Sequence, residues 1–321
     1  MMNKKLKIAS FFAGVGGIEL GFEQTKKFEV IYANEYNSES TKTYETNFKL
    51  KIDCRDIVKV KPEDIPDIDV MIGGFPCQAF SIAGYRKGFE DEKGRGTLFF
   101  EMLRLIKVKK PKIIFLENVK NLVSHDNGKT FRIILDSLKE NGYFVKYQVL
   151  NSMVYGNIPQ NRERIYIVGF KNEKQYQKFV FPEPIKLTKK IEDIIDTTHK
   201  LDDKYYYTAE KYPRIFETIK NTTLKENTIY QWRRIYLREN KSSVCPTLTA
   251  NMGTGGHNVP LINTKYGIRK LTPRECFLFQ GFPEDYNFPE KISDTALYKQ
   301  AGNSVVVPVI KRIAEKIIET L

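Results

Sequence analysis

Residues 5–27 read KLKIASFFAGVGGIELGFEQTKK. The first eight predict a β-strand, and residues 18–27 have the spacing of an amphipathic helix. The glycine-rich turn between them lets a ligand approach the backbone at the positively polarised end of a helix. Such a strand, loop and helix favour a nucleotide-type cofactor site. The glycines do not match the dinucleotide fingerprint, however, and a turn of this kind can serve chain reversal alone.

Strands and helices continue to alternate downstream of this unit. The sequence predicts strands over residues 28–34, 69–73, 112–117, 143–151 and 164–170, and helices over residues 38–47, 98–108 and 129–141. This order predicts right-handed crossovers and an α/β fold with a doubly wound, mostly parallel sheet. Residues 304–321 return to helical spacing, which suits a helix packed back on the same domain.

The pattern changes after residue 170. Pro182 and Pro184 indicate a linker, and the next eighty residues show few helix or strand periods of useful length. We therefore expect a catalytic and cofactor-binding domain over residues 1–180 and 300–321. Residues 181–299 are expected to form a smaller, irregular domain with a hinge.

Positive charge is concentrated in this second region. The chain has 52 Lys and Arg against 39 Asp and Glu, a net charge of +13. Residues 171–270 contain 19 basic and 11 acidic side chains, so a net +8 falls in under a third of the chain. An excess of this size favours a polyanionic partner such as nucleic acid. Solubility alone is the competing explanation.

Length and composition exclude several classes of protein. A chain of 321 residues with 12% aromatic content is neither a disulfide-stapled miniprotein nor disordered throughout. It has no apolar run of about 18 residues and no signal peptide, so we expect a cytoplasmic protein without a membrane span. Its four cysteines are far apart in sequence, which argues against a zinc ribbon or a disulfide framework. No metal is expected.

One of these cysteines, Cys77, has the sequence context of a nucleophile. It lies in GGFPCQAFS, residues 73–81, beyond the carboxyl end of a predicted buried strand, where sheets of this type bind ligands. Pro76 fixes the backbone before it, and the glycines leave it accessible. Residues 84–96, rich in glycine and charge, resemble a mobile lid. A lone cysteine is more often a small buried hydrophobe, so this context is what distinguishes it.

Charged residues follow other predicted strands. Glu117 ends an apolar run that would raise its pKa by desolvation, so it could donate a proton. Arg162 and Arg164, two apart, would share a strand face, and one of them would hold an acid or a carbonyl oxygen. Glu35 lies where doubly wound folds grip ribose hydroxyls, and Asp56 could accept from an adenine amine. Solvated acids at loop starts remain the alternative for the last two.

Taken together, these residues make the chain closely similar to the DNA (cytosine-5)-methyltransferases, especially those of bacterial restriction-modification systems. The resemblance spans nearly the whole chain, with the motifs in the family's order. The motifs are Phe-Ala-Gly-x-Gly-Gly at residues 12–17, Gly-Phe-Pro-Cys-Gln at 74–78, Glu-Asn-Val at 117–119, Gln-x-Arg-x-Arg at 160–164, Arg-Glu at 274–275, Gln-Gly-Phe-Pro at 280–283 and Gly-Asn-Ser-Val at 302–305.

The resemblance implies a Rossmann-like methyltransferase that uses S-adenosylmethionine and releases S-adenosylhomocysteine. Cys77 would add to carbon 6 of a cytosine in a short double-stranded DNA target, so that carbon 5 accepts the methyl group. Glu117 would bind or protonate ring nitrogen 3, Arg164 would bind the carbonyl oxygen, and Arg162 would brace the site. The base must first flip out of the duplex, at a cost of a few kcal/mol.

The resemblance also assigns the binding residues. The cofactor would contact the glycine loop, the two acids and several flanking residues: Phe12, Ala13, Gly14, Val15, Gly16, Gly17, Glu35, Tyr36, Asp56, Ile57, Pro76, Leu98, Asn303 and Val305. Residues 181–299 would recognise the target sequence. DNA contacts are expected from Gln78, Ser81, Arg233, Arg234, Arg238, Lys241, Thr247, Thr249, Asn251, Gly255 and Gly256.

A monomer that protects DNA from a cognate restriction endonuclease is the implied biological role. Methylation of transfer RNA cytosine is an alternative, which the variable recognition interval disfavours. A catalytically silent DNA-binding regulator would need only the basic charge and Trp232 with its arginines, leaving Cys77 and Glu117 as structural residues. A nicotinamide or flavin oxidoreductase is suggested only by the glycine loop and Glu35.

Overall fold

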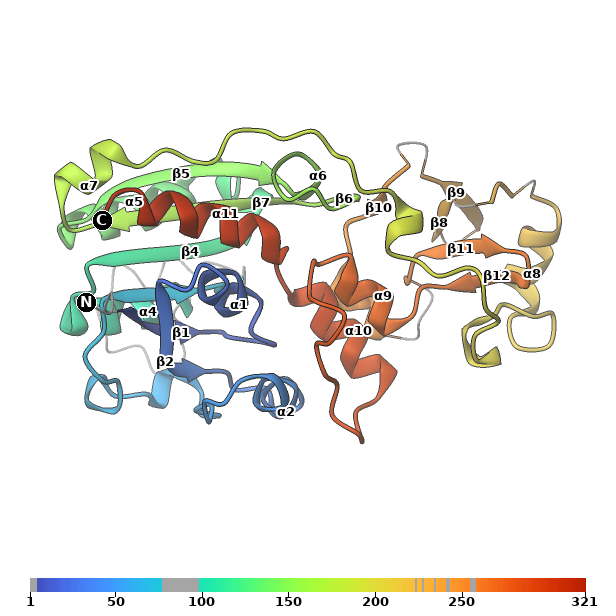
Figure 1. Cartoon of the computed structure of the whole chain (residues 1–321), viewed down its shortest axis with the longest axis horizontal. Coiled ribbons are helices and arrows are strands. Elements are labelled where there is room, and N and C mark those ends of the chain that lie inside the picture. Colours follow the sequence, from blue (N-terminus) through green and yellow to red (C-terminus); the bar gives the residue numbers. More distant parts are fainter. Residues whose placement is uncertain are drawn as a thin grey trace. The chain divides into compact units, whose positions relative to one another are not determined.

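The computed structural model describes residues 5–76, 98–222, 224–226, 228–233, 235–240, 243–254 and 258–321. The chain forms two compact units, both drawn in Figure 1. Unit 1 consists of Met1–Leu150, Glu163–Glu183 and Val309–Leu321. Unit 2 consists of Asn151–Arg162 and Pro184–Pro308. Residues 184–299 of the expected recognition domain therefore belong to unit 2.

Unit 1 is built on a six-stranded sheet in the order β2-β1-β3-β4-β7-β5. Its strands are β1 (Leu6–Phe11), β2 (Phe28–Asn34), β3 (Val70–Gly73), β4 (Ile113–Val119), β5 (Phe144–Asn151) and β7 (Glu163–Phe170). The pairs β1–β2, β1–β3 and β3–β4 are parallel, whereas β4 and β7 are antiparallel. The predicted α/β fold with a mostly parallel sheet is confirmed, because each predicted strand is present with ends displaced by at most two residues.

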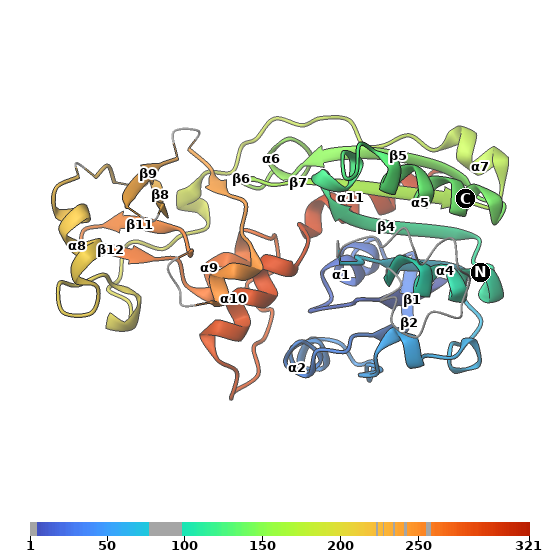
Figure 2. The ribbon, with the colours of Figure 1, turned by 180° about the vertical axis from the view of Figure 1, so that it is seen from behind.

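Helices cover both faces of this sheet (Figures 1 and 2). The helices of unit 1 are α1 (Gly17–Glu23), α2 (Ser38–Asn47), α4 (Leu98–Lys109), α5 (Lys129–Glu140), α7 (Glu173–Lys178) and most of α11 (Val307–Ile318), with short 3-10 turns η1 (Ile57–Lys59), η2 (Pro62–Asp64) and η4 (Lys120–Val123). In the described part of the chain, no helix has both the length and the apolarity required to cross a membrane.

Strand alternation divides the apolar residues between the two faces. On one face Phe11, Met71 and Leu116 join a continuous core with Met102 of α4 and Ile134 of α5. The other face is covered by α1 and α11. Gly21 of α1 allows close packing there, since a Cβ at this position would lie 2.6 Å from Ile310 of α11. The last helix thus returns to the first domain as its periodicity indicated.

Two of the predicted helices have wrong ends. The helix predicted over residues 18–27 ends at Glu23, because the Thr25 hydroxyl donates to the Phe22 carbonyl and Lys26 adopts a left-handed φ of 61°. The helix predicted over residues 304–321 begins only at Val307 and ends at Ile318. Ser304 instead terminates the preceding helix, to which its backbone N–H is bonded.

Unit 2 contains a small antiparallel sheet in the order β12-β11-β8-β9. Its strands are β8 (Ile229–Arg233), β9 (Tyr236–Glu239), β11 (Leu261–Thr264) and β12 (Gly267–Lys270), and β6 (Gln160–Asn161) pairs in parallel with β10 (Cys245–Pro246). Its helices are α6 (Ser152–Tyr155), α8 (Pro213–Lys220), α9 (Pro273–Leu278) and α10 (Asp294–Asn303), with 3-10 turns η5 (Ile191–Asp193), η6 (Asp203–Tyr205) and η7 (Ala250–Gly253). The sequence did not predict these strands, because each is short and interrupted by polar residues, whereas the equally short β3 is an uninterrupted apolar run.

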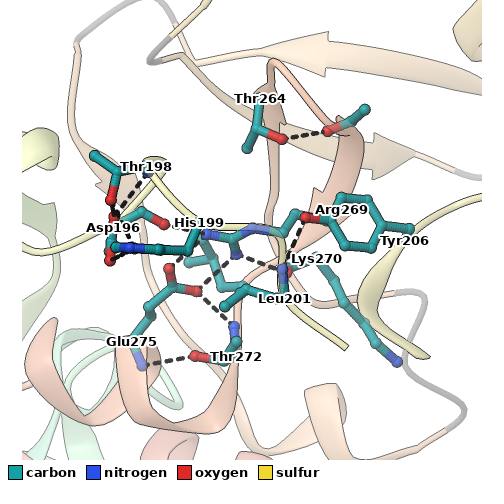
Figure 3. A network of polar contacts seen from close by, with 12 residues as sticks. Asp196, Thr198, His199, Leu201, Tyr206, Thr264, Arg269, Lys270, Thr272 and Glu275 are labelled. Atoms are coloured by element: carbon teal, nitrogen blue, oxygen red, sulfur yellow. Dashed lines mark hydrogen bonds and ion pairs between the residues drawn. The ribbon is translucent and has the colours of Figure 1, made fainter. Parts of the chain in front are cut away.

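A buried ion pair joins β12 to α9 in unit 2 (Figure 3). The Arg269 guanidinium donates to both carboxylate oxygens of Glu275, at 2.7 and 2.8 Å, and the two side chains are 1% and 7% exposed. Glu275 also accepts from the Thr272 backbone N–H, while the Thr272 hydroxyl accepts from the Glu275 N–H. This capping box starts α9. Arg269 also donates to the Asp196 carbonyl, which connects a third segment of the chain to β12 and α9.

Replacing Arg269 with Met should destabilise the protein by about 3–5 kcal/mol, because Glu275 would keep a buried charge without its partner. Urea unfolding followed by circular dichroism measures the loss. Lys225→Met provides a control, since its ion pair with Glu239 is exposed at the lysine and should contribute under about 1 kcal/mol. Equal losses for the two variants would contradict a structural role for the buried pair.

Candidate active site

Two of the predicted catalytic residues meet across neighbouring strands. In the antiparallel pairing of β4 with β7, Val119 lies opposite Arg164 and Glu117 lies opposite Tyr166. Residues two apart share a face, so Glu117 and Arg164 are diagonal neighbours. The Arg164 Nε lies 3.2 Å from a Glu117 carboxylate oxygen, and the side chains are 14% and 11% exposed. A carboxylate and a guanidinium are therefore held together in a largely desolvated place.

The chain leading to Cys77 starts beside this pair. A Cβ at Gly74 would lie 3.2 Å from a Glu117 carboxylate oxygen. The Asn118 side-chain amide donates to the Phe75 carbonyl at 2.6 Å, and both residues are 3% exposed. Asn118 therefore fixes the backbone two residues before the expected nucleophile, a role that the Glu-Asn-Val motif alone did not reveal.

Several predicted residues lie outside the described ranges. These are Cys77, Gln78 and Ser81, the lid expected over residues 84–96, and the DNA-contact candidates Arg234, Lys241, Gly255 and Gly256. Their assignments remain predictions. Pro76 is the last described residue before Cys77.

The glycine loop between β1 and α1 adopts an unusual backbone. Phe12, Gly14 and Gly16 all have positive φ, of 54°, 56° and 79°. Position 16 favours glycine because of its positive φ, and also because a Cβ there would lie 2.2 Å from the Phe48 ring. The predicted loop residues Ala13, Val15 and Gly17 complete this turn and are buried. The loop lies at the carboxyl end of β1, with Phe12 and Gly14 half-buried.

Glu35 is bonded to this loop. One of its carboxylate oxygens accepts from the Gly14 N–H at 3.0 Å, and the other accepts from the Asn37 N–H at 2.8 Å. The structure therefore brings together the loop and the acid that the sequence assigned separately to a cofactor. Such a carboxylate, oriented by two backbone donors, suits the hydroxyls of a ribose.

The remaining cofactor candidates occupy varied positions. Asp56 begins the turn η1, where its side chain accepts from the Val58 N–H at 3.1 Å, and Ile57 beside it is buried. Tyr36 is 71% exposed, and Leu98 is the first residue of α4. In unit 2, Asn303 is exposed at the end of α10 and Val305 is buried. The unit 1 residues fit a nucleoside group, since they combine a backbone loop, two carboxylates and apolar surface.

Glu19, which the sequence did not single out, is buried behind the loop. The Ser10 hydroxyl donates to its carboxylate at 2.6 Å. Burial raises the pKa of Glu19 to about 7, despite the opposing effect of the Ser10 bond. One sign of this burial was present in the sequence, since Glu19 lies between Ile18 and Phe22, two apolar positions on one face of α1. At neutral pH this group is therefore substantially protonated.

Arg162 is engaged within unit 2. The side chain is 2% exposed, and its guanidinium donates to the carbonyls of Leu248, Gly302 and Ser304. One cation thus holds the segment after β10 and the turn after α10 at the same time. The arginines of the Gln-x-Arg-x-Arg motif therefore have different partners, since Arg164 pairs with Glu117.

A buried amide network supports the same segment. The Gln160 amide donates to the Phe279 carbonyl at 2.7 Å and its oxygen accepts from the Leu248 N–H at 3.2 Å. Gln280 donates to the Ala301 carbonyl at 2.6 Å. A Cβ at Gly302 would lie 2.1 Å from the backbone that follows Leu248, so the two segments touch through their main chains. Residues 247–251 are consequently held in a fixed position.

A groove of about 450 Å³ lies in unit 2 beside these residues. It is lined by Asn161, Gln231, Trp232, Arg233, Arg238, Asn240, Pro246, Thr247, Thr249, Asn251 and Asn258. Five predicted DNA-contact residues, Arg233, Arg238, Thr247, Thr249 and Asn251, therefore meet at one concave surface. Sequence reasoning missed Asn161 and Asn240, which reach the groove from β6 and from the end of β9.

Replacing Asn118 with Ala should destabilise the protein by about 1–3 kcal/mol, because the buried Phe75 carbonyl would lose its donor. Asn141→Ala removes a similar amide bond, to the Ser137 carbonyl, at a less buried position, and should cost less. Urea denaturation of both variants tests the difference. If Asn141→Ala proves as destabilising as Asn118→Ala, the anchoring role is wrong.

Comparison with known proteins places this arrangement in a family. The profile described as C-5 cytosine-specific DNA methylase matches residues 6–319. The chain is 63% identical to type II methyltransferase M.Bsp6I of Bacillus sp. over 98% of its length and 99% of the relative. It is 39% identical to type II methyltransferase M.HhaI of Haemophilus parahaemolyticus, with 97% and 94% of the two chains covered.

Solved structures share the fold at lower sequence identity. A DNMT2 mutant from Spodoptera frugiperda superposes with a TM-score of 0.76 at 20% identity, with 98% of this chain and 100% of that chain covered. The family profile and the curated relatives cover nearly the entire chain, including both units and every motif described above. The chain therefore belongs to the C-5 cytosine-specific DNA methylases.

Proposed function

We propose that this methylase transfers a methyl group from S-adenosylmethionine to carbon 5 of a flipped-out cytosine in a short, specific double-stranded DNA sequence. The observation that carries the proposal is the Glu117–Arg164 pair beside the anchored backbone that leads to Cys77. A cytosine ring needs a nucleophile at carbon 6, a proton donor or hydrogen-bond partner at nitrogen 3 and a cation at its carbonyl oxygen. These three residues supply those groups.

The Cys77 thiolate forms a bond to carbon 6, which makes carbon 5 nucleophilic. Glu117 binds nitrogen 3 and neutralises the charge that this addition places on the ring, while Arg164 binds the carbonyl oxygen. Carbon 5 accepts the methyl group, and loss of its proton with departure of the Cys77 sulfur restores the ring. The ion pair orients both groups before the base arrives, so little reorganisation is needed.

S-adenosylmethionine, when bound, supplies a methyl group carried on a positively charged sulfur. The loop at residues 12–17 and Glu35 would hold its methionine portion and ribose, and Asp56 with Ile57 would hold the adenine. The bonds from Glu35 to the Gly14 and Asn37 backbone support this assignment. Tyr36, Pro76 and Leu98 are proposed to complete the part of the site that lies in unit 1.

Duplex DNA is the proposed partner of the groove in unit 2. Relatives that are 39% and 63% identical are named type II methyltransferases, which supports protection against a cognate endonuclease as the role. The same relatives disfavour transfer RNA methylation and catalytically silent DNA binding. We also propose that the enzyme acts as a monomer.

Bisulfite sequencing of plasmid DNA from cells that express the protein tests reaction and target together. We expect protected cytosines at one short sequence, and none with Cys77→Ala, which loses the nucleophile but should retain DNA binding. Electrophoretic mobility shifts check that retention. Protection by the Cys77→Ala variant would refute the mechanism. An absence of protection by soluble wild-type protein would redirect the search to RNA.

Glu35→Ala should weaken binding of S-adenosylhomocysteine about 10- to 100-fold, because charge-assisted hydrogen bonds to the ribose and to the Gly14 N–H are lost. Isothermal titration calorimetry measures this change. Glu39→Ala removes an exposed acid from the first turn of α2 and serves as the control. Similar affinities for these two variants would remove Glu35 from the cofactor site.

A further inference from the structure

Three polar side chains lie together on one face of the β8–β9 hairpin. Gln231 and Arg238 are directly opposite in the antiparallel register. Arg233 is two residues from Gln231 and therefore shares its face. The Gln231 carbonyl oxygen accepts from the Nη2 of Arg233 at 3.3 Å and from the Nη2 of Arg238. All three residues line the groove of unit 2.

This arrangement orients donors toward a ligand. A guanidinium has five N–H donors in one plane and no acceptor. Gln231 takes one donor from each arginine, which fixes the planes while leaving other donors available. Among the described residues that line the groove, none is acidic. The hairpin face therefore complements a planar edge that offers closely spaced acceptors.

We propose that Arg238, oriented by Gln231, donates to O6 and N7 of a guanine within the recognition sequence of the methylase. Guanine is the base that presents two adjacent acceptors in the major groove, and paired donation from arginine is their usual match. Gln231 acts as a positioning residue, because it holds the Arg238 plane and does not itself read the base. The inference depends on the proposed binding of duplex DNA in this groove.

The same donors could instead grip a phosphate, but two features favour the base. A phosphate accepts from many directions and does not require a guanidinium plane fixed by a neighbouring amide. The groove is also lined by the amides of Asn161, Asn240 and Asn251, which both donate and accept. Such mixed groups suit base edges, whereas phosphates offer only acceptors.

The test uses the full-length enzyme and the duplex identified by bisulfite sequencing. Each guanine in that duplex is replaced in turn by 7-deazaguanine, which lacks the N7 acceptor, and kcat/KM is measured for every duplex. We expect the wild-type enzyme to lose about 5-fold or more at one guanine. Arg238→Ala should lose about 5- to 150-fold on unmodified DNA. It should then show no further loss at that same guanine, because the contact is already absent.

Two further variants distinguish a contact with the base from a structural role and from a general effect of positive charge. Gln231→Ala should give a smaller loss and a weakened effect of 7-deazaguanine at the same position only, which a general structural role would not produce. Arg214→Ala removes an exposed arginine of α8 that does not line the groove, and should leave the 7-deazaguanine pattern unchanged. Thermal unfolding of all three variants should match the wild type.

Distinct outcomes overturn the inference. Equal losses for Arg238→Ala on all duplexes, with a reduced salt dependence, would assign Arg238 to a phosphate. Kinetics of Arg238→Ala that match those of Arg214→Ala would remove Arg238 from the interface. Failure of the proposed function is distinguishable, because the wild-type enzyme would then methylate no duplex at all.

Discussion

The antiparallel register of β4 against β7 fixes the proposed catalytic pair of this methylase, Glu117 and Arg164. With Val119 opposite Arg164, the diagonal neighbour of that arginine is Glu117, and the two side chains form an ion pair. The next residue, Asn118, anchors the Phe75 carbonyl. A slip of one residue would turn Glu117 to the opposite face. The positions of Glu117, Arg164 and the Asn118 anchor of Phe75 therefore all depend on one strand pairing.

Unit 2 depends on two buried arginines. Arg162 donates to three backbone carbonyls, and Arg269 forms a bidentate pair with Glu275. Burying a guanidinium is unfavourable unless its donors are satisfied, so each arginine constrains the segments that supply acceptors. Unit 2 also buries apolar side chains such as Leu261, Ile262 and Phe277. We infer that these cations fix the position of segments whose own secondary structure is too limited to do so.

These contacts support the groove that we propose binds DNA. The groove takes residues from β6, from the β8–β9 hairpin and from the segment around Thr247. Gln160 and Arg162 both bond to the backbone of Leu248, so the wall formed by Thr247 and Thr249 is held by residues distant in sequence. A preorganised wall limits the conformational entropy lost on binding.

The sequence by itself determined the alternating fold of unit 1, because its strands and helices are long enough to show their periods, and it identified the family from short motifs. It also selected Glu117, Arg164 and Glu35, since charged residues at strand ends stand out from apolar runs. It could not show that Arg162 and Arg164 have different partners, or that Asn118 holds Phe75. Nor could it identify the small sheet of unit 2 or the meeting of Gln231 with Arg238. Those features arise from contacts between distant or very short segments, and only the tertiary structure specifies which side chains meet there.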